Sequence, residues 1–164
     1  MRLVQRIAFI WIALGLNFGC VTVSVGEKKG QPAQNIQVVP PTSPFEEMKT
    51  PDADRAWQNA RTGTSISYTS DCGGADPSLK SIQQTVLQGL TEVTIESEDK
   101  TTFNSREALD TVASGSVDGV PVKIRFITFK KNNCNFTLNY FAVARHFASG
   151  LPAFQQFISK FRAP

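Results

Sequence analysis

Residues 120–147, VPVKIRFITFKKNNCNFTLNYFAVARHF, carry the pattern that decides the fold. Apolar and polar residues alternate along VKIRFI, and the alternation resumes along FTLNYF after the polar turn KKNN. A period of two residues on both sides of a short turn predicts a β-hairpin. The preceding Asp118-Gly119 pair favours a type I′ turn that leads into this hairpin. Residues 105–117 carry both helix and strand signals, and we favour a strand, which predicts a C-terminal meander of three antiparallel strands.

Two further segments show strand patterns. Residues 64–70, TSISYTS, alternate apolar residues with hydroxyl residues, and Val93 and Ile95 do the same within TEVTIES. Both segments are expected to be strands, the second followed by a polar loop over residues 99–104.

Helical patterns surround these strands. Asp76 and Pro77 are typical of a helix start, and the apolar residues that follow recur at helical spacing through Leu90. A short helix is also expected over residues 51–60, with Trp57 in the core. The order of elements predicts an α+β domain with a mainly antiparallel sheet, covered by helices.

The last predicted helix, residues 151–162, places Phe154, Phe157 and Phe161 on one face. This aromatic face is expected to pack on the sheet. A second interpretation is that it lines a cavity for small apolar ligands or lipids between the helix and the sheet.

The N-terminus carries an export signal. Arg2 and Arg6 precede a run of ten apolar residues, IAFIWIALGL, which is about half the length needed to span a bilayer. We therefore expect residues 1–19 to be a signal peptide. Gly19 and Cys20 resemble the end of the lipobox of bacterial lipoproteins, which implies a diacylated Cys20. The alternative is ordinary cleavage after Gly15, which leaves Cys20 as a free thiol.

The number of cysteines favours lipidation. The chain has three cysteines, and an odd number in an exported protein needs a use other than an internal disulfide for one of them. Lipidation of Cys20 leaves Cys72 and Cys134 to form one disulfide in an oxidising compartment. Residues 20–50, with several prolines and no sustained apolar period, are expected to form a flexible tether. Residues 51–164 are then a single globular domain.

Composition excludes one class of partner. The 164-residue chain has a formal net charge of +3, and loss of Arg2 and Arg6 with the signal leaves it nearly neutral. Nucleic-acid binding requires a clustered basic face, so no nucleic-acid partner is expected.

The chain also resembles known proteins. The meander followed by a Phe-rich C-terminal helix, over residues 56–162, resembles the PsbP/Mog1-like fold. The segments VDGVPVK and KKNNCNFTLNYFAV are similar to small uncharacterised lipoproteins of Gram-negative bacteria. The resemblance implies an α+β envelope domain; photosystem or GTPase roles do not follow from a shared fold.

No set of residues predicts a catalytic, metal or cofactor site. His146 is the sole histidine, and the two cysteines that it would need for zinc are far apart in sequence without a CxxC pair. A Cys-dependent enzyme with His146 as base and Asp71 as its orienting partner is a minor alternative.

The sequence thus predicts a non-catalytic binding or accessory protein of the bacterial envelope. It is expected to be anchored through Cys20, to face the periplasm, and to bind other envelope proteins. Val21 after Cys20, rather than Asp, favours the outer membrane.

Overall fold

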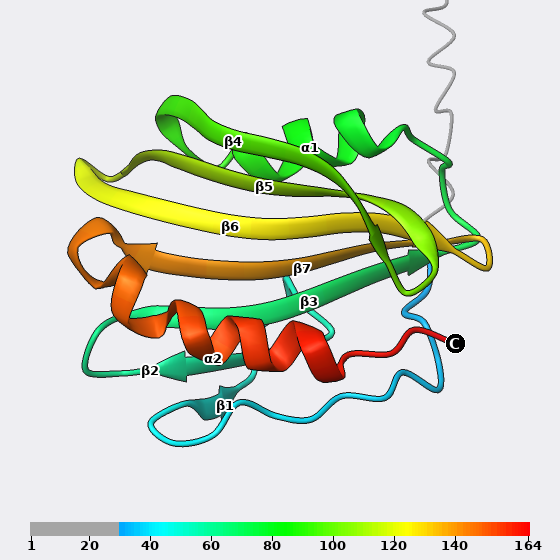
Figure 1. Cartoon of the computed structure of the whole chain (residues 1–164), viewed down its shortest axis with the longest axis horizontal. Coiled ribbons are helices and arrows are strands. Elements are labelled where there is room, and N and C mark those ends of the chain that lie inside the picture. The colour runs from blue at the N-terminus through cyan, green and yellow to red at the C-terminus, as the bar shows by residue number, and fades with distance from the viewer. Residues whose placement is uncertain (1–29) are drawn as a thin grey trace, which may run out of the picture.

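Antiparallel strands form one seven-stranded sheet in this computed structural model, which describes residues 30–164 (Figure 1). The predicted signal peptide and Cys20 lie outside the described residues. The sheet order is β1-β2-β3-β7-β6-β5-β4. The strands are β1 (Glu46–Met48), β2 (Arg55–Asn59), β3 (Thr64–Cys72), β4 (Thr91–Phe103), β5 (Arg106–Val117), β6 (Val120–Lys131) and β7 (Cys134–Val143).

The strands from β4 to β7 form a meander of four strands, one more than the sequence predicts. Each two-residue turn of this meander uses residues with positive φ, as type I′ hairpin turns require. These turns are Asn104-Ser105, Asp118-Gly119 and Asn132-Asn133. The predicted Asp118-Gly119 turn and the strand over residues 105–117 are therefore confirmed.

Two α-helices lie on opposite faces of the sheet. α2 (Phe147–Lys160) follows a short 3-10 helix, η1 (Ala144–His146), and packs on β7 and β3, in front of the sheet in Figure 1. α1 (Leu79–Leu87) packs on β5 and β6 from behind. Each helix spans only part of a face, so the sheet is less covered than predicted. Ser78, rather than Asp76, caps α1, because its hydroxyl accepts a hydrogen bond from the Ser81 amide.

The helix predicted over residues 51–60 is wrong. Residues 55–59 form β2, which pairs with β1 on one side and with β3 on the other. Trp57 is nevertheless in the core as predicted, with 2% of its surface exposed, and its ring lies 5.5 Å from that of Phe157. Strand pairing on both edges satisfies the backbone of these residues and overrides the weak helical spacing.

The predicted flexible tether does not extend through the described residues 30–50. Gln31 pairs with Cys72, and Gln37 pairs with Arg162, through backbone hydrogen bonds. Ile36 and Phe45 pack against the core. Part of the predicted tether, from Gln31 to Phe45, therefore belongs to the folded domain.

The polar loop predicted over residues 99–104 is also wrong. β4 continues through it to Phe103, as an exposed edge strand of 13 residues paired with β5. The residues of β4 are mostly polar because this edge strand is exposed to solvent. No helix within residues 30–164 is long and apolar enough to cross a membrane.

Candidate functional site

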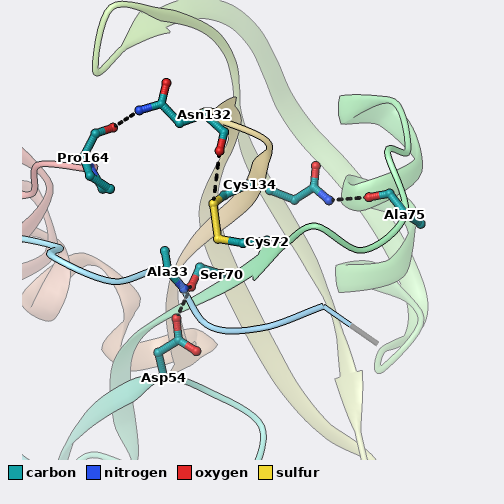
Figure 2. Close-up of a disulfide and its surroundings, with 9 residues drawn as sticks. Ala33, Asp54, Ser70, Cys72, Ala75, Asn132, Cys134 and Pro164 are labelled. Atoms are coloured by element: carbon teal, nitrogen blue, oxygen red, sulfur yellow. Dashed lines mark hydrogen bonds between the residues drawn. A yellow bond between two sulfur atoms is a disulfide. The ribbon is translucent and has the colours of Figure 1, made fainter. Parts of the chain in front are cut away.

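The predicted disulfide between Cys72 and Cys134 is present (Figure 2). Cys72 ends β3 and Cys134 begins β7, and the two residues lie opposite each other in the register of the two strands. The bridge therefore ties two neighbouring strands together where both meet the loops at one end of the sheet.

An open groove of about 870 Å³ lies beside this disulfide. It forms because β2 pairs with β3 only as far as Tyr68, so the last residues of β3 have no β2 neighbour. The incoming chain partly fills this space, with Gln31 bonded to Cys72. The lining residues are Gly30, Pro32, Pro51, Asp52, Ala53, Asp54, Thr69, Ser70, Asp71 and Ala75.

Ser70 organises one wall of the groove (Figure 2). Its hydroxyl accepts a hydrogen bond from the Ala33 amide at 2.7 Å and donates one to Asp54 Oδ2 at 2.5 Å. Burial raises the pKa of Asp54, and the hydrogen bond from Ser70 opposes this effect in part. Asp54 is thus a partly desolvated carboxylate held in one orientation by β3.

Asp71, the residue after Ser70 in β3, supplies a second carboxylate to the lining of the groove. Its Oδ1 is shielded from solvent and has no hydrogen-bond partner among residues 30–164. The carboxylate is wedged between Gly30 and Gly74, and a Cβ added at Gly74 would lie 2.7 Å from Oδ1. These glycines leave the space that the side chain occupies.

The groove therefore has an excess of hydrogen-bond acceptors. Asp52, Asp54 and Asp71 form no ion pair within the part of the chain that the structure describes. Such a lining favours a ligand that brings donors, such as backbone amides or the cationic ends of Lys and Arg.

The predicted aromatic face of α2 is a packing face. Phe154, Phe157 and Phe161 are each at most 2% exposed. Phe154 stacks 5.6 Å from Tyr140, and Phe161 lies 5.3 Å from Tyr68. Aromatic rings thus fill the space between α2 and the sheet in which the carrier hypothesis places its ligand, and this structural result contradicts that site.

The residues of the zinc and Cys-enzyme alternatives do not come together. The sulfur atoms of Cys72 and Cys134 are bonded to each other, so neither is available as a thiolate. His146 lies beyond the far end of β7 from Cys134. Within residues 30–164 no group of three or more metal-binding side chains is present.

Sequence reasoning missed the groove. Asp52 and Asp54 have the spacing of acidic residues in a first helical turn, and the sequence relates Asp71 only to His146. The available signal is the cluster of turn-forming residues around Pro51 and Gly73-Gly74, which marks both walls as irregular backbone.

The fold belongs to the PsbP-like class, as the sequence resemblance predicted. LpqN of Mycobacterium tuberculosis, described as involved in cell envelope biogenesis, has a similar structure with a TM-score of 0.63 at 14% identity, over 82% of this chain and 86% of LpqN. Cyanobacterial PsbP from Synechocystis has a TM-score of 0.57 at 10% identity, over 86% of this chain and 96% of PsbP. No protein-family model and no curated protein matches the sequence. At these identities the likeness shows the fold alone.

Proposed function

We propose that this protein is a lipid-anchored accessory protein of the bacterial envelope that binds an extended segment of another envelope protein in the groove beside the disulfide. The single observation that carries this proposal is the groove itself. It is open, rich in acceptors and built on strands that a covalent bridge holds together.

The dimensions and chemistry of the groove suit a peptide. About 870 Å³ lies within the range of ligand pockets. Asp54 and Asp71 offer acceptors to a basic side chain, while Pro32 and Pro51 provide apolar walls. An extended segment with a Lys or Arg is the ligand that uses both features.

The envelope location rests on the N-terminal sequence. Disulfide pairing of Cys72 with Cys134 accounts for two of the three cysteines, which leaves Cys20 for lipidation. The fold that the chain shares with LpqN is found in a protein of envelope biogenesis, which supports the same compartment. Val21 favours the periplasmic face of the outer membrane.

Site-specific crosslinking tests the groove. A photo-reactive amino acid at Asp52 in the groove, or at exposed Arg61 in the β2–β3 turn as the matched control, is placed in the full chain in its own cells. We expect a defined envelope protein crosslinked from position 52 and not from position 61, and its loss in the Asp54→Asn, Asp71→Asn background. Identical products from both positions would contradict binding in the groove.

A separate experiment tests the anchor. Cells that express the wild-type chain or Cys20→Ala are labelled with a fatty-acid analogue. Labelling should occur in the wild type alone, because the thiol of Cys20 accepts the diacylglycerol. Equal labelling of both chains would refute the anchor and leave the groove proposal standing.

A further inference from the structure

Four cationic side chains gather at the end of the sheet that holds the disulfide. We call them the basic end: Arg106, Lys130, Lys131 and Arg162. Arg106, Lys130 and Lys131 line a hollow of about 280 Å³ with the β6–β7 turn. Lys131 and Arg162 line a second hollow of about 410 Å³ with the β4–β5 turn. The two hollows share Lys131, so the four cations form one surface.

Two carboxylates lie beside this surface, Asp76 in its first hollow and Glu107 directly after Arg106 in β5. Lys130 pairs with Asp76. Lys131 instead donates to the carbonyl of Ala163, and Arg162 donates to the carbonyls of Ser159 and Phe161. Carbonyl oxygens orient these cations without neutralising them. Arg106 has no ion pair within residues 30–164.

The opposite end of the sheet has a different balance of positive and negative charge. It carries exposed Arg61 in the β2–β3 turn and Arg145 in η1, but also exposed Asp118 in the β5–β6 turn and Glu92 at the start of β4. The basic end thus carries a cluster of four cations, although the aspartates of the groove adjoin it through Ala75.

The basic end is also where the chain arrives from the N-terminus (Figure 1). Gln31 is hydrogen-bonded to Cys72, Cys72 is bonded to Cys134, and Cys134 pairs with Lys131 of β6. Cys20 precedes Gly30 by ten residues, which span at most about 35 Å when fully extended. Lys28 and Lys29 lie within this connection in the sequence.

We propose that the basic end binds the anionic phospholipid headgroups of the membrane that holds Cys20. This inference rests on the proposed anchor, which brings the surface within reach of the headgroups. Each Lys or Arg near an anionic bilayer increases binding by about fivefold. The acidic groove lies on the other side of the disulfide from Asn132 in the β6–β7 turn (Figure 2). Binding through the basic end orients the strands end-on to the bilayer and leaves the turns with Arg61 and Arg145 facing the periplasm.

Vesicle binding tests this surface without the anchor. Residues 20–164 with Cys20→Ser, which include every described helix and strand, are sedimented with phosphatidylcholine vesicles that contain or lack phosphatidylglycerol. The test pair is Arg106→Gln with Lys131→Gln, and the control pair is Arg61→Gln with Arg145→Gln, which removes the same charge. Arg106→Gln with Arg162→Gln is a second test pair that keeps the Lys131 contact with Ala163.

Binding should require phosphatidylglycerol, weaken with salt, and fall about twentyfold in both test pairs but not in the control pair. Equal losses in test and control pairs would show a net-charge effect and overturn the proposal. Absence of binding to anionic vesicles, or full displacement by inorganic phosphate, would overturn it as well. None of these results depends on Cys20, so failure here is distinct from failure of the anchor.

Discussion

Cys72 and Cys134 occupy directly opposite positions in neighbouring strands, with their Cα atoms 4.0 Å apart. The bridge closes a separation of 62 residues, which includes α1 and the strands β4, β5 and β6. A short connection in space thus constrains almost half of the described chain. The acidic groove and the basic end both lie next to this bridge and share Ala75 in their linings.

Loss of the bridge should lower stability without changing the fold. The Cys72→Ala, Cys134→Ala variant should lose about 4 kcal/mol of unfolding free energy, because a loop of this length gains that much entropy in the unfolded chain. Denaturant unfolding of the variant and of the wild type with and without reductant measures the loss. An unchanged midpoint would contradict it.

Stability should depend on the ionisation of Asp54. Burial raises the pKa of Asp54 in the folded protein above its ordinary value of 3.8. The stabilisation that this shift provides is therefore complete below pH 3.8 and is lost as the pH rises through the folded pKa. The Asp54→Asn variant has no ionisable group at this position, so it does not lose this stability as the pH rises. Its stability relative to wild type should therefore increase between about pH 3 and about pH 7 in urea unfolding. A difference independent of pH would contradict the burial of this charge.

Gly150→Ala should destabilise the protein although it lies within α2. Alanine is favoured over glycine in a helix interior by about 1 kcal/mol. The added Cβ, however, would contact the buried Tyr140 hydroxyl, which donates a 2.7 Å hydrogen bond to the Phe147 carbonyl. We expect a net loss of about 1–3 kcal/mol in thermal or denaturant unfolding. Ser149→Ala, at the exposed neighbouring position, is the control; a stabilised Gly150→Ala would disprove the contact.

Phe161→Ala should be among the most damaging core substitutions. The Phe161 ring is fully buried, and several other rings lie within 6.4 Å of it. Removal of such a ring costs about 3–5 kcal/mol. Phe141→Ala, a half-buried ring on the opposite face of the sheet, should cost clearly less. Equal losses in chemical unfolding would mean that the core is less well packed than the structure shows.

Local signals in the sequence are sufficient for the three strands β5, β6 and β7. The alternation along β6 and β7 and the Asp118-Gly119 turn are short-range features that the structure retains. The disulfide was accessible from the number of cysteines and the export signal. Each of these inferences depends on residues that are close in sequence or on simple chemistry.

The segments before β3 depend on contacts that no local pattern records. Residues 55–59 become β2 because β3 and β1 lie on either side. Trp57 is in the core both in the predicted helix and in the observed strand. The segment with Gln31 and Gln37 is ordered by backbone pairing with Cys72 and Arg162, which are distant in sequence. The groove arises where these long-range pairings end, so its acidic residues had no visible connection in the sequence.

The two hydrogen bonds between Gln31 and Cys72 also determine how mechanical load enters the domain. Tension on the chain before Gly30 acts first on these bonds, at 2.8 and 3.0 Å, at the end of β3. The disulfide then transmits the force covalently to β7, which is held by β3 on one side and by β6 on the other. A pull on the chain before Gly30 is therefore resisted by the middle of the sheet, and the edge strands β1 and β4 carry none of it directly.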